Sequence, residues 1–114
     1  MVAARAADDK QGTDIVVLDV GDIIGITEIF VLVSANNTRL VRTICDEVEL
    51  ALKVEDDLAP RSIEGLKDSS WVLLDYGVLV VHVFLQETRD FYELERLWTD
   101  APQVEWEPER RSTV

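Results

Sequence analysis

Two β-rich runs joined by only two residues constrain the fold of this chain more than any other feature. Residues 71–76 and 79–84 consist mainly of β-branched, leucine and aromatic side chains, and Gly77 and Val78 separate them. A two-residue connection joins antiparallel strands, and glycine at its first position favours a type II′ turn. The sequence therefore predicts a β-hairpin at this place.

Side-chain alternation gives this hairpin two different faces. In the expected register, Trp71 pairs with Phe84 and Leu73 pairs with His82. One face then carries Trp71, Leu73, Asp75, Val80, His82 and Phe84. The other is more purely apolar and carries Val72, Leu74, Tyr76, Leu79, Val81 and Val83. The same register places Asp75 diagonally across the hairpin from His82, within reach of a contact.

Short apolar runs and helical patterns make up the rest of the chain. Residues 15–20 and 29–33 are rich in β-branched side chains and apolar on both faces, which is typical of buried strands. Gly12 is expected to end a first helix, and residues 23–28 to form a connector. Alanine content and helical spacing of apolar residues predict the helices, and a short extended piece precedes Gly65. The helices cover residues 3–10, 38–54 and 87–98, and the extended piece covers residues 62–64.

The C-terminal part of the sequence divides it into one domain and a tail. From Thr99 the composition shifts, and Pro102 and Pro108 interrupt regular structure. We therefore expect a single domain over residues 1–98 and a loosely ordered tail over residues 99–114. The last predicted helix of the domain has an apolar stripe that consists of Phe91, Leu94, Leu97 and Trp98.

The chain is strongly acidic. Its 114 residues include 23 acidic and 11 basic side chains, which give a formal net charge of −12. A field of this sign repels phosphate backbones and attracts basic protein surfaces. Direct binding of DNA or RNA is therefore disfavoured. A basic protein partner is one reading of the charge, and an acidic soluble protein without such a partner is the other.

Cysteine content and hydropathy point to the cytoplasm. Cys45 is the only cysteine, so no intramolecular disulfide can form, which fits a reducing compartment. The start of the chain lacks the apolar segment of a signal peptide. No apolar run approaches the roughly 20 residues that a membrane-spanning helix needs. We expect a cytoplasmic protein.

The sequence carries no pattern that predicts catalysis. A nucleotidyltransferase needs a Gly-Ser turn and carboxylates two residues apart to hold Mg²⁺. Asp19 and Asp22 are three residues apart and follow no Gly-Ser pair. His82 stands between two valines, and Cys45 lies on the apolar side of a helix, so both are expected to be packed residues. We therefore expect no enzyme activity, no cofactor and no metal site.

Five blocks of the sequence have distinctive patterns in a fixed order. They read Asp-Ile-Val-Val-Leu-Asp-Val, Thr-Glu-x-Phe-Val-Leu, Pro-x-x-x-Glu-Gly, Trp-x-Leu-x-Asp-Tyr-Gly with Val-His-Val-Phe, and Arg-x-Phe-Tyr-x-Leu-Glu-x-Leu-Trp. They lie at residues 14–20, 27–32, 60–65, 71–84 and 89–98. Together they resemble the ribosomal silencing factor (Iojap-like) family. Two departures are Val78, where the family usually has aspartate, and Ala35-Asn36, where it usually has glycine.

This resemblance implies both a fold and a function. The fold is α/β: a single domain with a mixed β-sheet and flanking helices, similar in topology to nucleotidyltransferases but without their catalytic residues. Members bind the large ribosomal subunit through its ribosomal protein fourteen, block association with the small subunit and so repress translation under nutrient limitation. Members tend to form homodimers when off the ribosome. Two alternatives are an assembly factor for the large subunit and a nucleotidyltransferase-like enzyme.

The resemblance also directs attention to the hairpin block for partner binding. Trp71 is expected to be an exposed anchor, Asp75 an acceptor for a lysine or arginine of the partner, and Tyr76 a mixed contact. Leu79 and Glu64 complete the expected contact residues. Core packing is the alternative role for Trp71. Because strand alternation puts Trp71 and Asp75 on one face and Tyr76 on the other, one flat face cannot present all three.

Overall fold

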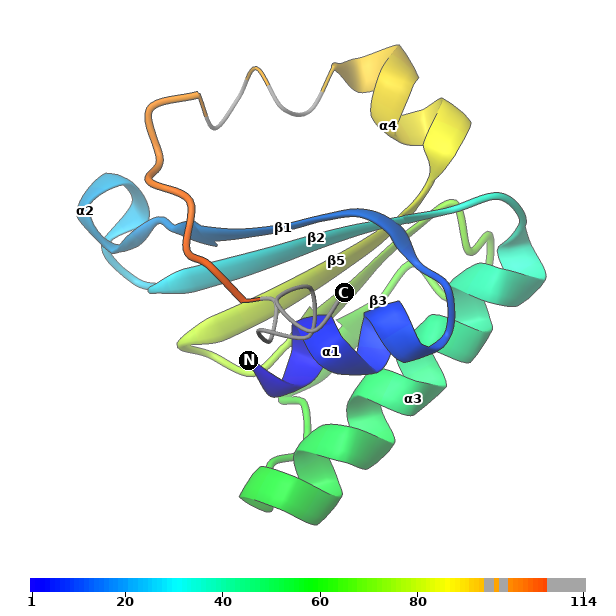
Figure 1. Cartoon of the computed structure of the whole chain (residues 1–114), viewed down its shortest axis with the longest axis horizontal. Coiled ribbons are helices and arrows are strands. Elements are labelled where there is room, and N and C mark those ends of the chain that lie inside the picture. Colours follow the sequence, from blue (N-terminus) through cyan, green and yellow to red (C-terminus); the bar gives the residue numbers. More distant parts are fainter. Residues whose placement is uncertain (94–95, 97–98, 107–114) are drawn as a thin grey trace, which may run out of the picture.

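A computed structural model of the chain describes residues 1–93, 96 and 99–106 (Figure 1). The helices are α1 (Val2–Asp9), α2 (Gly21–Ile24), α3 (Thr38–Asp56) and α4 (Gln86–Tyr92). The strands are β1 (Thr13–Asp19), β2 (Ile29–Ala35), β3 (Ser62–Glu64), β4 (Trp71–Asp75) and β5 (Leu79–Leu85). The predicted strands, the extended piece and the first two predicted helices are confirmed with small shifts of their ends. The predicted connector at residues 23–28 begins instead inside α2, which Gly25 ends in a left-handed conformation.

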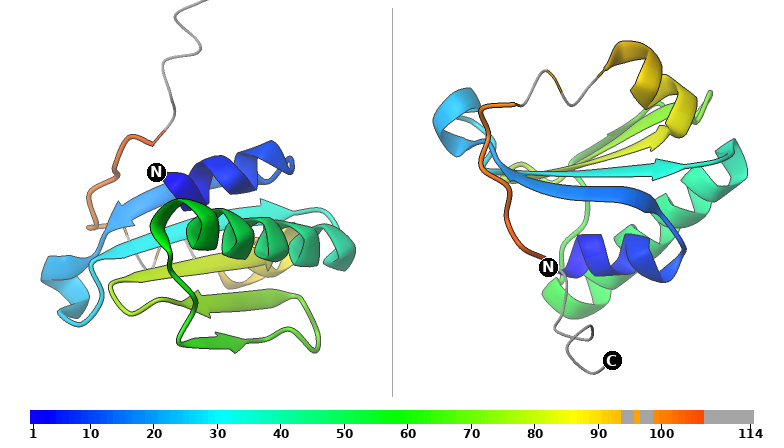
Figure 2. Two further views of the ribbon diagram at one scale, coloured as in Figure 1. Left: turned by 90° about the horizontal axis from the view of Figure 1, so that it is seen from below. Right: turned by 45° about the horizontal axis from the view of Figure 1, so that its top comes forward.

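The strands of the described part form one mixed sheet in the order β1-β2-β5-β4-β3. β2 and β5 are parallel, and the other neighbouring pairs are antiparallel. α1 and α3 cover one face of the sheet, and α4 lies on the other face (Figure 1). Figure 2 shows α1 and α3 side by side on their shared face. The predicted α/β fold with a mixed sheet and flanking helices is confirmed.

β4 and β5 form the predicted hairpin. Trp71 pairs with Phe84 and Leu73 with His82, so the predicted register is confirmed. Gly77 has a φ of 89°, while Val78 keeps a negative φ, a combination that fits a type II′ turn. The more apolar face of the hairpin packs beneath α1 and α3, as part of a core that includes buried alanines of α1 and the apolar side of α3.

The end of α1 differs from the prediction. Gln11, not Gly12, takes the left-handed conformation, with a φ of 67°. The N–H groups of Gln11 and Gly12 donate to the carbonyl oxygens of Asp8 and Ala7, which satisfies the end of the helix. Gly12 is required for space instead: a Cβ there would lie 2.6 Å from Cγ1 of Val33.

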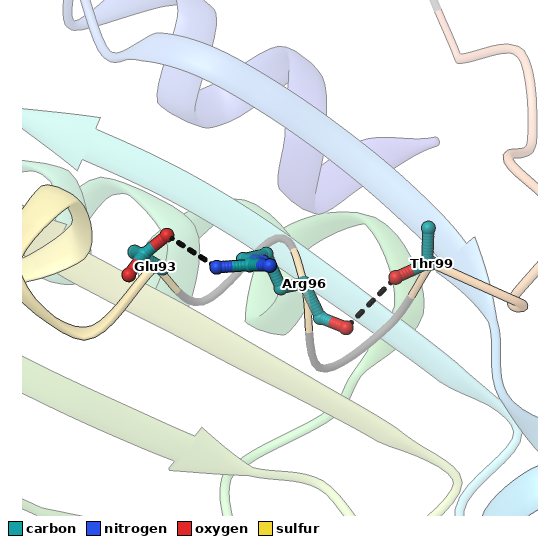
Figure 3. Close-up of polar contacts among 3 residues, drawn as sticks. All are labelled: Glu93, Arg96 and Thr99. Atoms are coloured by element: carbon teal, nitrogen blue, oxygen red, sulfur yellow. Dashed lines mark hydrogen bonds and ion pairs between the residues drawn. The ribbon is translucent and has the colours of Figure 1, made fainter.

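α4 is shorter than the predicted helix over residues 87–98. Glu93 has a φ of 49° and ends the helix after Tyr92. Arg96 then donates from Nη1 to a carboxylate oxygen of Glu93 at 2.9 Å, and the Thr99 hydroxyl donates to the carbonyl of Arg96 at 2.7 Å (Figure 3).

Residues 102–106 run beside β1. The N–H of Val104 donates to the carbonyl of Val17 at 2.8 Å, and the indole N–H of Trp106 donates to the carbonyl of Ile15 at 3.3 Å. These contacts attach the first part of the predicted tail to the sheet. The predicted domain boundary after residue 98 and the last eight residues of the tail lie outside the described part of the chain.

Candidate protein-binding surface

The structure separates the five residues that the sequence predicts as partner contacts. Trp71 and Asp75 lie at opposite ends of β4 on one face of the sheet. Tyr76 and Leu79 lie on the other face and are buried with the core under the helices. Glu64 is exposed on the edge strand β3. No single surface therefore presents all five, as strand alternation predicts for three of them.

Trp71 combines the two roles expected as alternatives from the sequence, an exposed anchor and a packed core residue. Its side chain is half-buried, and its indole N–H donates to Nδ1 of His82 at 3.2 Å. Its ring lies 5.2 Å from that of Phe84 and 6.1 Å from that of Tyr92, centroid to centroid. One side of Trp71 thus packs against the face of the sheet opposite α1 and α3. Tyr92 extends the aromatic surface toward solvent.

Two exposed aromatic side chains on α4 continue this surface. Phe91 is 77% exposed and Tyr92 is 57% exposed, and their rings meet edge to face at 4.9 Å. With Trp71 they form what we call the aromatic patch. Glu87 lines the open hollow beside these two rings, and Asp90 adds a second exposed carboxylate on α4. Large exposed aromatic residues next to carboxylates suit a protein partner with basic side chains.

Arg89 fixes the helix that carries these aromatics. It is 1% exposed, and Nη1 donates to the carbonyl of Asp14 and to the hydroxyl of Ser34, each at 2.8 Å. Its guanidinium also lies 5.9 Å from the ring centroid of Phe84. Asp14 has a φ of 48° at the irregular start of β1, where the pairing register with β2 shifts. The buried arginine thus anchors α4 to the backbone at this irregularity.

The predicted apolar stripe of the last helix is wrong at Phe91. Arg89 faces the sheet, and a residue two positions later points to the opposite side of a helix. The sequence motif contains Arg89, but an arginine in an amphipathic pattern normally indicates solvent exposure, so its role was missed. The other predicted members of the stripe, Leu94, Leu97 and Trp98, lie outside the described residues.

Asp75 and His82, which the expected register places within reach of each other, do not form a hydrogen bond. Asp75 instead accepts from the N–H of Gly77 at 2.7 Å and so supports the hairpin turn. His82 is paired with Trp71, and its Nε2 is buried without a hydrogen-bond partner. Burial lowers the pKa of His82 to about 4. His82 is therefore neutral at pH 7 and packed, as predicted.

Cys45 is a core residue, as predicted. It is buried in α3, and burial, with smaller contributions from Glu49 and Asp46, raises its pKa to about 12. A thiol with so high a pKa is a poor nucleophile. Within the described residues, no group of three or more histidine, cysteine, aspartate or glutamate side chains is placed to hold a metal ion. None of the helices in this part of the chain is long and apolar enough to cross a bilayer.

Comparison with known proteins decides the family. The family described as "Ribosomal silencing factor during starvation" matches residues 1–113 of this chain. The chain belongs to the ribosomal silencing factor family. It is 38% identical to ribosomal silencing factor RsfS of Bacillus subtilis (strain 168) over 101 residues, which are 89% of this chain and 85% of that protein.

A solved structure and a eukaryotic relative extend the family match. The crystal structure of a protein from Chromobacterium violaceum superposes with a TM-score of 0.80 at 31% identity, covering 94% of this chain and 84% of that one. The mouse protein named "Mitochondrial assembly of ribosomal large subunit protein 1" is 37% identical over 95 residues, which cover 79% of this chain and 40% of that protein. The predicted membership of the ribosomal silencing factor family is confirmed.

Proposed function

We propose that this ribosomal silencing factor binds the large ribosomal subunit through ribosomal protein fourteen of that subunit. In doing so it blocks association with the small subunit and represses translation under nutrient limitation. The family match supports the ribosome as the partner. The aromatic patch is the observation that supports a protein contact, because exposed Phe91 and Tyr92 beside Trp71 have no partner surface within the described chain that covers them.

Charge supports a basic partner for this patch. The net charge of −12 favours encounter with positively charged protein surfaces, and the same field opposes close contact with ribosomal RNA. Glu87 lines the hollow beside the exposed rings, and Asp90 is a second exposed carboxylate on α4. Lysine or arginine side chains of the partner would meet these carboxylates while an apolar group packs against the rings.

The five contact residues enter the proposal with different roles. Trp71 supplies the inner part of the aromatic patch, and Glu64 an exposed acceptor on the neighbouring sheet edge. Asp75 and Leu79 would contact a partner only around the hairpin tip. Tyr76 is buried, so we propose that it holds the hairpin in shape. We further propose a cytoplasmic location and a homodimer in the absence of ribosomes.

The test is binding to purified large subunits with matched surface variants. Tyr92→Ser removes a ring that is 57% exposed, and Leu50→Ser removes a side chain that is 58% exposed on α3, on the opposite face of the sheet. We expect Tyr92→Ser to weaken co-sedimentation by about tenfold, equivalent to about 1.4 kcal/mol, while Leu50→Ser binds normally. Equal binding by both variants would show that the aromatic patch does not contact the subunit. If the wild-type protein stays at the top of a sucrose gradient when large subunits are present in excess, the proposed function is wrong.

A second function, assembly of the large subunit, is supported by the name of the mouse relative. Both functions require the same binding partner, so binding alone does not separate them. Deletion of the gene distinguishes the two functions. Loss of a silencing factor leaves normal large subunits but more joined ribosomes in starved cells. Loss of an assembly factor leaves immature large subunits even in rich medium.

A further inference from the structure

An apolar groove of about 260 Å³ opens at the end of the sheet remote from the aromatic patch. The hairpin turn, the first residues of α1 and the end of α3 meet there. Its apolar wall consists of Met1, Val2, Ile29, Leu52, Leu58, Val78 and Leu79. We call this feature the tip groove, because Val78 of the hairpin tip forms one of its lips.

Backbone hydrogen bonds hold the tip groove open. The N–H groups of Glu28 and Ile29 both donate to the carbonyl of Val78, at 2.9 and 3.0 Å. The Thr27 hydroxyl donates to the carbonyl of Gly77 at 3.1 Å. These bonds fix the hairpin tip against the start of β2. A preformed groove loses little conformational entropy when a partner binds, so more of the interaction free energy contributes to affinity.

The opposite wall is fixed in a similar way. The N–H of Leu58 donates to the carbonyl of Leu52 at 3.1 Å, just beyond the left-handed Asp57 that ends α3. Leu58 is therefore held over the groove although its side chain is exposed. Fixed walls on both sides give the groove a defined shape.

The lips of the tip groove leave apolar side chains in water. Val78 is 60% exposed, and Leu58 and Met1 are also exposed. Ile26 adds a further exposed side chain in the hollow that shares Val78 as its border. Contiguous exposed apolar groups around a preformed groove are typical of a surface that binds another protein.

The charged side chains in the lining of the groove are both acidic. Glu28 and Asp56 are exposed, and neither makes an ion pair within the described residues. The single lysine of α3, Lys53, is paired with Asp57 at 2.9 Å. A second copy of this chain would bring further carboxylates to these two, whereas lysine or arginine would neutralise them.

We propose that the tip groove is a docking site for a lysine- or arginine-rich segment of a partner protein. One aliphatic or aromatic side chain of that segment enters between Val78 and Leu58. Basic residues on either side of it lie against Glu28 and Asp56. This site is separate from the aromatic patch, and it shares with the five proposed ribosome-contact residues only Leu79. The proposal does not depend on the ribosome contact, because the groove is defined by its own walls and charges.

The test uses synthetic heptapeptides and fluorescence anisotropy. The probe peptide is Lys-Lys-Ala-Leu-Ala-Lys-Lys, and its controls carry serine in place of the leucine or glutamate in place of the lysines. We expect saturable binding of the probe alone, with amide NMR shifts concentrated at Ile29, Leu58 and Val78. Val78→Lys should weaken binding at least tenfold. The matched variant Val54→Lys, at a valine that is 73% exposed on α3 and outside the groove, should change it less than twofold.

Three results would overturn the proposal. Equal binding of the leucine and serine peptides would show that the peptides bind by general charge attraction and not through an apolar side chain in the groove. Loss of affinity that is equal in Val78→Lys and Val54→Lys would place binding elsewhere. Concentration-dependent dimerisation that Val78→Lys abolishes, without peptide binding by the wild type, would make a second copy the occupant. If Val78→Lys unfolds, the surface variants Glu28→Gln and Asp56→Asn take its place, each with an expected loss of two- to fivefold.

Discussion

The indole N–H of Trp71 donates a hydrogen bond to Nδ1 of His82 at 3.2 Å across the β4–β5 hairpin. Because Nδ1 accepts, the proton of the neutral imidazole must sit on Nε2, which is buried and has no hydrogen-bond partner. The ring of Phe30 lies 4.6 Å from that of His82, centroid to centroid, and the ring of Phe84 stacks nearly parallel to that of His82 at 5.8 Å. A charged imidazolium in this place would lose both solvation and the bond from Trp71.

Stability should therefore fall in mild acid. Burial lowers the pKa of His82 to about 4, below the value of about 6.5 for an exposed histidine. Between these two pH values the unfolded state binds more protons, so the free energy of unfolding decreases as the pH falls from about 6.5 to about 4. We expect a loss on the order of 2–3 kcal/mol from this residue, measured by urea unfolding at a series of pH values.

His82→Gln separates this effect from the titration of carboxylates. The variant keeps a polar side chain near Trp71 but cannot take up the proton. Its overall stability should be lower at pH 7.5, while its pH dependence between 6.5 and 4.5 should be shallower than that of the wild type. Identical slopes for the two proteins would show that the pKa of His82 is the same in the folded and unfolded states.

Trp71→Phe tests the hydrogen bond without removing the ring. Phenylalanine keeps most of the contact with Phe84 but leaves Nδ1 of His82 without its donor. A buried acceptor without a partner costs about 1–3 kcal/mol, and we expect a loss in this range by urea unfolding. Trp71→Glu places a carboxylate against the aromatic cluster and should cost more. A Trp71→Phe protein as stable as the wild type would contradict the structural role of the bond.

Arg89→Met should release α4 from the sheet. The substitution keeps an unbranched apolar chain but removes the donors to Asp14 and Ser34. We expect a loss of about 2–4 kcal/mol, because charge-assisted bonds to buried acceptors disappear. Amide hydrogen exchange should rise in α4 more than in α3. Faster exchange in both helices to the same extent would indicate global destabilisation instead.

Two glycines with nearly equal φ angles separate the effects of strain and crowding. Gly65 has a φ of 90° and Gly25 a φ of 85°. A Cβ at Gly65 would overlap the carbonyl oxygen of Trp71, whereas a Cβ at Gly25 meets nothing within 4 Å. Gly25→Ala should cost about 1 kcal/mol, the strain of a left-handed alanine. Gly65→Ala should cost at least about 2 kcal/mol more, since β4 must move. Equal melting temperatures for the two variants would disprove the close approach.

One of the three residues of the aromatic patch was predicted from the sequence as a partner contact, and the other two were not. The hairpin block identified Trp71, which does lie in the aromatic patch. Phe91 was expected to be buried and is instead the most exposed member of that patch. The reason is Arg89: a helical pattern shows which residues share a side, but a buried arginine reverses which side faces the sheet.

Local patterns determined the elements of this protein. Hairpin register, strand positions and the long amphipathic helix α3 follow from alternation, turn chemistry and helical spacing, all of which act within a few residues. The order of the strands and the role of Arg89 depend on contacts across the chain, such as the bonds from Arg89 to Asp14 and Ser34. The tip groove likewise joins residues from α1, β2, α3 and the hairpin. Only the tertiary structure decided these features, because hydrogen bonding and exclusion of water depend on distance in space and not on spacing in sequence.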